Sequence, residues 1–176
     1  VGKNGDTAVV KYNQTPYASI TWSTAYGLAK KIITNSEATS YLCSSYAWDT
    51  AVNFIQNNST AKNYATSIKG FNGNWNPQAG DPSGNVIKPA GTSQQLTTGL
   101  TTQFCNIFDM GGNEAEFTTE LNPGTSETVV LRGGNYNNNN PAGNRWDNNS
   151  GNANINNGFR ATLISFSMYR FKDLCQ

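Results

Sequence analysis

The side chains of this chain that could do chemistry are mostly uncharged amides. Of its 176 residues, 26 are Asn, and 12 of these fall between positions 135 and 157. An Asn side chain offers N–H donors and a carbonyl acceptor, which suits polar ligands such as sugars or protein backbone. Tyr136 and Trp146 lie in the same segment and supply the rigid aromatic area that anchors many binding surfaces. This pattern indicates that positions 135–157 bind a polar ligand.

The residue types that are missing exclude several kinds of catalysis. The chain has no His, which removes Ser–His and Cys–His nucleophile pairs and His-ligated zinc, iron or haem. Cys43, Cys105 and Cys175 are the only cysteines, too few for a disulfide framework, and we expect small buried residues or stray thiols. Charged residues make up 13% of the chain and the net charge is +1, so no nucleic-acid partner is expected.

Two helices are predicted in the first third of the chain to position these side chains. The first begins at Ser23, and its apolar residues repeat on one helical face as far as Ile33. Asn35 and Ser36 should end it. The second begins after Ser44 and Ser45, which are good N-cap residues. Its apolar face ends in the polar run at 56–58.

Strands are predicted on both sides of the Asn-rich segment. Thr128–Leu131 is β-rich, Ala161–Phe166 forms a last strand, and Ala8–Val10 is the apolar part of a first one. The segment itself should be mostly loop, because an Asn amide competes with the backbone for hydrogen bonds. Positions 57–103 show little periodicity, and we expect packed irregular structure there, held by four apolar side chains: Ile68, Phe71, Trp75 and Val86.

The chain length fits one α+β domain spanning 1–176. No apolar stretch reaches the roughly 18 residues that a membrane span needs, so direct membrane insertion is not expected. The chain begins with Val1 and not Met, and we expect it to be the C-terminal part of a longer protein.

Three blocks in fixed order resemble the formylglycine-generating enzyme, or sulfatase-modifying-factor, domain. Ile20–Trp22 and Ala47–Asp49 are similar to that family's V-S-W and E-A-E-W-E segments, and 109–118 (DMGGNEAEFT) is similar to D-M-x-G-N-x-W-E-W-T. Leu131–Tyr136 (LRGGNY) and Gly158–Arg160 (GFR) are similar to L-R-G-G-S-W and its closing G-F-R. The resemblance covers roughly 16–164 and implies a C-type lectin-like fold, with two helices, small antiparallel sheets and much irregular loop.

The resemblance carries over the fold better than the activity. In the enzyme branch two cysteines bind the copper that activates oxygen, and the matching places here are Asn138 and Gly143. Neither can replace a thiolate, which is the soft ligand that Cu(I) needs, and the iron-dependent branch uses His. We therefore expect no copper, no iron and no enzyme activity. An oxygen-dependent modifying enzyme is the rival interpretation.

The Asn-rich segment resembles the variable region of diversity-generating retroelement proteins, in which Asn codons are the usual targets of adenine randomisation. The resemblance implies a variable region at 132–160, displayed on a phage fibre tip or bacterial surface, hence outside the cell or on a virion. It implies a cell-surface protein or glycan receptor as partner and a homotrimer as assembly. The expected ligand-binding residues are Asn135, Tyr136, Asn137, Asn138, Asn139, Asn140, Asn144, Trp146, Asn148, Asn149, Asn152, Asn154 and Asn156. The alternatives are a fixed lectin-like domain that binds carbohydrate or protein, and a purely structural domain.

The resemblance also implies a structural Ca²⁺ at Asp109, Gly112, Glu114 and Glu116. Two carboxylates and two backbone carbonyls would supply part of the roughly six to eight oxygen ligands that Ca²⁺ takes. In the alternative, Glu116 pairs with an arginine such as Arg132 and no metal binds. Arg132 and Arg160 are expected to be structural, each holding a carbonyl or a carboxylate through its guanidinium.

Overall fold

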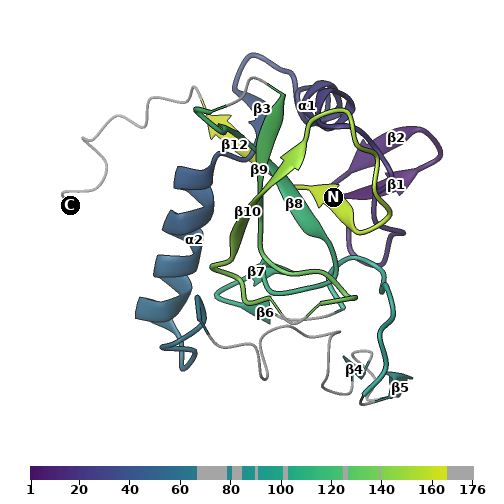
Figure 1. The fold of residues 1–176 in the computed structure, drawn as a ribbon, viewed down its shortest axis with the longest axis vertical. Coiled ribbons are helices and arrows are strands. Elements are labelled where there is room, and N and C mark those ends of the chain that lie inside the picture. The colour runs from purple at the N-terminus through teal and green to yellow at the C-terminus, as the bar shows by residue number, and fades with distance from the viewer. Residues whose placement is uncertain are drawn as a thin grey trace.

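The computed structural model describes residues 1–66, 79–80, 85–89, 91–100, 103–124, 127–138 and 140–165. The helices are α1 (Trp22–Ala29) and α2 (Ser45–Asn58). The strands in chain order are β1 (Gly2–Asn4), β2 (Thr7–Val9), β3 (Ala38–Leu42), β4 (Ala79–Gly80), β5 (Val86–Lys88), β6 (Gln103–Phe104), β7 (Ile107–Phe108), β8 (Ala115–Leu121), β9 (Thr128–Arg132), β10 (Arg145–Asn149), β11 (Asn157–Phe159) and β12 (Ala161–Ser165). The described chain is α+β, as predicted (Figure 1).

A four-stranded sheet forms the centre of the molecule, in the order β10-β9-β8-β11. Strands β8, β9 and β10 are antiparallel neighbours, and β11 runs parallel to β8. The remaining strands form two-stranded pairs: β1-β2, β3-β12, β4-β5 and β6-β7. Helix α2 lies on one side of the sheet, and the connection from β10 to β11 curves around the other side (Figure 1).

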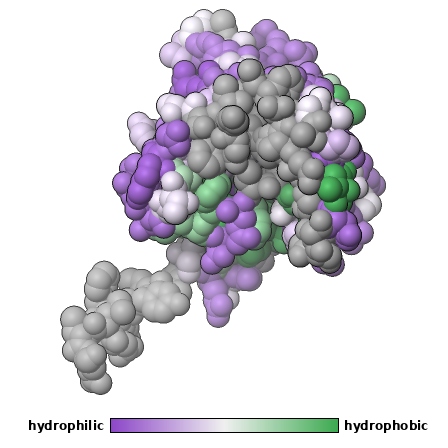
Figure 2. Space-filling model, turned by 90° about the horizontal axis from the view of Figure 1, so that it is seen from below, coloured by the Kyte–Doolittle hydropathy of each residue, from purple (hydrophilic) through white to green (hydrophobic). Residues whose placement is uncertain are grey.

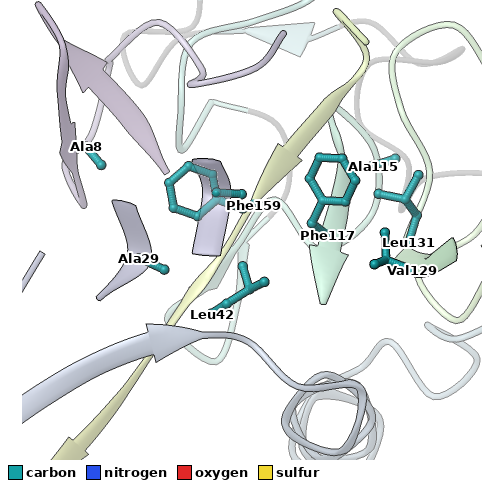
Figure 3. Packing of buried hydrophobic residues seen from close by; sticks show 9 residues of the cluster. Ala8, Ala29, Leu42, Ala115, Phe117, Val129, Leu131 and Phe159 are labelled. Atoms are coloured by element: carbon teal, nitrogen blue, oxygen red, sulfur yellow. The ribbon is translucent and has the colours of Figure 1, made fainter. Parts of the chain in front are cut away.

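One face of the sheet carries the main apolar core. Phe117, Val129 and Leu131 are buried there because alternate side chains of a strand point to the same face. They pack with Phe159 of β11 and with the small residues of α1 (Figure 3). A second buried cluster surrounds Trp48 of α2. The Asn-rich segment therefore connects strands whose apolar side chains are buried in the core.

The second helix is confirmed and the first is shorter than predicted. Ser44 caps α2 by accepting a hydrogen bond from the Ala47 amide at 3.1 Å. Helix α1 ends at Ala29, although the apolar pattern continues to Ile33. The reason is Ser40, whose hydroxyl donates to the Ala29 carbonyl at 2.6 Å and accepts from the Ile33 amide at 2.9 Å. These bonds bring the chain back toward β3.

Two of the strand predictions are confirmed, and the structure differs at the N-terminus and inside the Asn-rich segment. The single strand predicted around Ala8–Val10 is a hairpin of β1 and β2, and Val10 follows β2 and is exposed. Strand β9 matches the predicted Thr128–Leu131 run, and β12 matches the last strand, of which Phe166 lies outside the described residues. The segment is not all loop, because Arg145–Asn149 forms β10 and pairs with β9 over five residues. That pairing satisfies backbone groups that Asn would otherwise compete for, so tertiary context overrides propensity.

The prediction of packed irregular structure at 57–103 falls mostly on positions that the structure leaves undescribed. Ile68, Phe71 and Trp75 lie outside the described residues. Val86 is exposed in β5, so this side chain does not contribute to packing.

Candidate ligand-binding surface

The site is built on a pair of motif arginines that hold the sheet to its surroundings. Arg160 donates through Nε and Nη2 to the two carboxylate oxygens of Glu116, at 2.9 and 3.1 Å, and Nη2 also donates to the Phe108 carbonyl at 2.9 Å. Glu116 is buried, and the guanidinium lies 5.6 Å from the centre of the Trp48 ring. The prediction that Arg160 is structural is confirmed.

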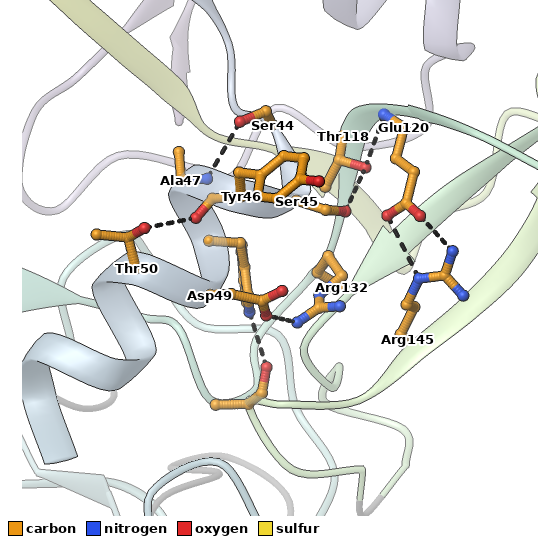
Figure 4. Close-up of polar contacts among 12 residues, drawn as sticks. Ser44, Ser45, Tyr46, Ala47, Asp49, Thr50, Thr118, Glu120, Arg132 and Arg145 are labelled. Carbon is orange, nitrogen blue, oxygen red and sulfur yellow. Dashed lines mark hydrogen bonds and ion pairs between the residues drawn. The ribbon is translucent and has the colours of Figure 1, made fainter.

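Arg132 connects the polar face of the sheet to α2. Its guanidinium forms an ion pair with Asp49, one of the polar contacts that join α2 to the sheet (Figure 4). Beside it, the hydroxyls of Ser45 and Thr118 lie 3.3 Å apart. Arg132 is buried, so the prediction that it is structural is confirmed as well. Glu116 thus pairs with Arg160 and not with Arg132, whose partner is Asp49.

We call the sheet, Arg132, Arg160 and the helix α2 that they hold the frame. The backbone of the Asn-rich segment is hydrogen-bonded to this frame. The indole N–H of Trp48 donates to the Ala142 carbonyl at 2.8 Å, and the Gly143 amide donates to the Ala65 carbonyl at 2.9 Å. A Cβ on Gly143 would lie 2.5 Å from that same Ala65 oxygen. The place that would hold one of the family's copper-binding thiolates has no room for a side chain without a shift of the backbone.

A groove of about 280 Å³ opens between the two loops that flank β10. Trp146 and Asn148 line it from the half-buried side of β10. Eight of its eleven lining residues are Asn, and none is acidic; the lining is Leu131, Asn135, Asn138, Asn140, Asn144, Arg145, Trp146, Asn148, Asn154, Asn156 and Asn157. The groove is therefore polar and has no negative charge of its own.

The groove gathers most of the predicted ligand-binding residues. Eight of them line it: Asn135, Asn138, Asn140, Asn144, Trp146, Asn148, Asn154 and Asn156. Four others lie outside the lining: Tyr136, Asn137, Asn149 and Asn152. Asn139 is outside the described residues.

The sequence interpretation missed Leu131, Arg145 and Asn157 as lining residues. Recognising β10 as a strand would have placed Arg145. The Arg145 guanidinium donates a hydrogen bond to the Glu120 carboxylate, and this contact lowers the pKa of Glu120. Asn157 is buried at the start of β11.

Short-range hydrogen bonds fix the shape of the loops. The side-chain oxygen of Asn135 accepts from the Asn137 amide at 2.9 Å, and that of Asn154 accepts from the Asn156 amide at 2.8 Å. The two loops also meet directly, since the Asn137 side-chain amide donates to the Asn156 side-chain oxygen at 3.0 Å. The contacts of Asn135 and Asn154 with amides two positions on are Asx turns, which order a loop without help from the core.

The acidic residues of the expected calcium site are engaged by other groups. Both oxygens of Glu116 face Arg160, and one oxygen of Asp109 accepts from the Gly99 amide at 2.6 Å. Glu114 is buried against Gln95, and this burial raises the pKa of its carboxyl to about 8. Among the described residues no three acidic or Cys side chains are grouped so that they could hold a metal. The arrangement does not fit a calcium site, because a guanidinium stands where the ion needs free carboxylate oxygens.

A larger hollow, of about 470 Å³, lies on another part of the surface. Val10, Tyr12 and Phe108 give it apolar walls, and Glu114 and Arg160 lie at its polar end. Nothing in the sequence indicated a binding role for Val10, Tyr12 or Phe108. Because the groove unites the Asn side chains and this hollow does not, the groove is the better candidate for the recognition that the composition indicates.

Within the described ranges, no helix has the length and apolar character needed to cross a membrane. The face seen in Figure 2 is mainly hydrophilic where its residues are described, with small separate hydrophobic patches.

Comparison with known proteins shows relatives by fold but none by sequence. No protein-family model matches the chain, and no curated protein matches it. The structure of CarF is similar, with a TM-score of 0.60 and 15% identity over 85% of this chain and 67% of that one. Treponema denticola variable protein 1 is also similar, with a TM-score of 0.50 and 19% identity over 81% of this chain and 54% of that one. The chain thus spans about two thirds and about half of these proteins, and at such identities the likeness shows a shared fold.

Proposed function

We propose that this chain is a ligand-binding domain that recognises a polar partner in the groove formed by the Asn-rich segment, on a C-type lectin-like scaffold. The observation that carries the proposal is the composition of the groove, with eight Asn and one half-buried Trp from two loops and an edge strand. Binding sites are commonly built from loops that a rigid scaffold positions. Here the scaffold is the sheet that Arg132 and Arg160 hold.

We further propose that the segment is the variable region of a diversity-generating retroelement protein. Two findings support this: the fold shared with a variable protein of Treponema denticola, and the concentration of Asn between 135 and 157. The partner would be a cell-surface protein or glycan, met outside the cell or on a virion, and the assembly would be a homotrimer. A fixed lectin-like domain is the second candidate, because the local hydrogen bonds of Asn135 and Asn154 would serve an invariant loop equally well.

The proposed role is binding without catalysis. The two places that would hold copper-binding cysteines are occupied by Asn138 and Gly143, and the second has the Ala65 carbonyl too close for a side chain. A copper titration tests the rival oxidase directly. Stoichiometric, tight Cu(I) binding would favour the enzyme over the binding domain.

The direct test is a screen of the protein against a glycan array and a panel of cell-surface proteins. The comparison is a variant in which Asn148, Asn154 and Asn156 are replaced by Ser. We expect at least one ligand of the wild type to lose binding by about tenfold or more in the variant, since truncating central contact residues costs about 2 kcal/mol or more. Far-UV circular dichroism must show that the variant is folded. A folded variant that binds every ligand as the wild type does would refute the proposal.

A further inference from the structure

The hollow of about 470 Å³ shares no lining residue with the Asn-rich groove. Its volume is within the range of about 300–1,000 Å³ that small-ligand sites span. Three of the large apolar side chains that the described chain exposes line this hollow: Val10, Tyr12 and Phe108, which are 71%, 46% and 37% exposed. Exposed apolar residues that are scattered singly need no explanation, but a group of them around one concavity marks a site of interaction.

Gly99 brings the two aromatic walls of the hollow together. Its φ is +82°, a backbone conformation that residues with a side chain rarely adopt. A Cβ at this position would lie 2.7 Å from Cδ2 of Tyr12 and 3.8 Å from Cδ1 of Phe108. The absence of a side chain at Gly99 thus lets both rings approach the same stretch of backbone.

The wall that carries Tyr12 is held in place by Thr98. The Thr98 amide donates to the Gln14 carbonyl at 2.8 Å, and the Thr98 carbonyl accepts from the Asn13 amide at 2.8 Å. The Thr98 hydroxyl donates to the Lys11 carbonyl at 2.6 Å. Because these three bonds join positions 11–14 to position 98, the hollow is formed without a ligand, as most small-ligand sites are.

The charged side chains at the polar end of the hollow are engaged by the protein itself. Both oxygens of Glu116 accept from Arg160, at 2.9 and 3.1 Å, and the Asp109 carboxylate accepts from the Gly99 amide at 2.6 Å. The Glu114 side chain is buried and accepts a hydrogen bond from a side-chain amide. An ionised ligand would therefore give up its hydration on entering the hollow without meeting a buried charge that lacks a partner.

We propose that the hollow binds an uncharged aromatic molecule, whose rings pack against Tyr12 and Phe108. The aromatic walls favour an aromatic ligand, because offset or edge-to-face ring pairs attract one another beyond the effect of the area they bury. The pairing of the charged groups at the polar end favours an uncharged one. Lys11, the remaining charged side chain of the lining, is exposed and keeps its hydration. This site is separate from the groove, so the proposal does not depend on the proposed function.

The test compares two fluorescent probes with the same ring system. N-phenyl-1-naphthylamine is uncharged, whereas 1-anilinonaphthalene-8-sulfonate carries a sulfonate on the same rings, and the emission of both rises in an apolar environment. The variants Tyr12→Ser and Phe108→Ser each remove one wall of the hollow. Their matched controls are Tyr46→Ser and Phe54→Ser, because these two side chains are exposed on α2 and lie outside the lining. Far-UV circular dichroism shows whether each variant is folded.

We expect the uncharged probe to bind with a stoichiometry of one and to lose about tenfold or more of its affinity in either hollow variant. In the two control variants its affinity should stay within about twofold of the wild type. The sulfonate should bind more weakly than the uncharged probe. Equal losses in the hollow and control variants, or tighter binding of the sulfonate, would overturn the proposal.

Amide NMR spectra of the wild type locate the uncharged probe even if a hollow variant does not fold. Bound rings should shift the Gly99 amide, which lies in the hollow, and leave the Asn148 and Asn154 amides of the groove unchanged. Shifts confined to the groove, or a probe that does not bind at all, would overturn the proposal and leave the proposed function standing. The variant in which Asn148, Asn154 and Asn156 are replaced by Ser should bind the probe as the wild type does.

Discussion

The frame of the sheet and the Asn-rich segment satisfy their polar groups over very different distances along the chain. In the frame, Arg160 binds Glu116 across 44 positions and Arg132 binds Asp49 across 83. In the segment, the side-chain oxygens of Asn135, Asn149 and Asn154 accept from amides two positions away.

This difference separates stability from recognition. The Arg160–Glu116 contact holds a buried carboxylate, and its loss leaves that carboxylate unpaired in the interior. A two-residue Asx turn can be replaced by another turn residue without disturbing the core. The segment can therefore vary in sequence while the frame stays fixed, which is what a binding surface for changing partners requires.

The largest expected effect comes from breaking the buried ion pair of the frame. Arg160→Met leaves the Glu116 carboxylate buried without its partner, and we expect the free energy of unfolding to fall by about 3–5 kcal/mol. Urea unfolding followed by circular dichroism measures the change. The double variant Arg160→Met with Glu116→Leu should recover part of the loss, because it removes the unpaired charge. A single variant as stable as the wild type would show that the frame does not depend on this contact.

The frame should also show a pH dependence that the segment lacks. Burial raises the pKa of Glu114 to about 8, against 4.5 in a model compound. A raised pKa means that the stabilised form is the protonated one, so its contribution is complete below the unfolded pKa and is lost as the pH rises through the folded value. Between pH 5 and pH 8 we expect stability to fall by on the order of 3 kcal/mol.

The matched variant for this pH dependence is Glu114→Gln, which cannot titrate. Its free energy of unfolding should change much less between pH 5 and pH 8 than that of the wild type. Parallel pH profiles for the two proteins would contradict the assignment of this titration to Glu114.

Substitutions in the segment should leave stability almost unchanged. Asn154 is exposed, and its oxygen serves a turn that Ser can also form. We expect Asn154→Ser to change the free energy of unfolding by less than about 0.5 kcal/mol, as is usual at surface positions. A fall in the free energy of unfolding of about 2 kcal/mol or more in the same urea experiment would show that the segment contributes to stability as the frame does.

The smallest expected effect concerns calcium. Since the Glu116 carboxylate is held by Arg160 and the Asp109 carboxylate by the Gly99 amide, added calcium or a chelator should shift the melting temperature by less than about 1 °C. Differential scanning fluorimetry with both additives measures this. A clear rise in melting temperature that saturates with calcium would show that these residues rearrange to hold the ion.

The sequence predicted the frame better than the segment, for physical reasons. The Ser44 cap and the apolar face around Trp48 placed α2, because caps and periodicity are local signals. The motif arginines were assigned a structural role, and a pair between Glu116 and an arginine such as Arg132 was one alternative. That Glu116 pairs with Arg160, and Asp49 with Arg132, could not be deduced, since those contacts are set by tertiary packing. Strand β10 was missed because Asn has low strand propensity and only the pairing with β9 overrides it.

The groove was predicted as a set of residues but not as a shape. Composition indicated that the amides from 135 to 157 would act together, and eight of the expected residues do line one groove. Nothing in composition distinguishes Asn137 and Asn152, which lie outside the lining, from Asn148 and Asn154, which lie within it. That distinction depends on strand alternation in β10 and on the turns that direct each amide.

Sequencing the gene across a natural population of its source tests the central claim most directly. If the Asn-rich segment is a diversified binding surface, substitutions concentrate in the codons of groove residues such as Asn144, Asn148, Asn154 and Asn156. Trp48, Glu116 and the two motif arginines then stay constant. A segment as invariant as the frame, or substitutions spread equally over both, would contradict it.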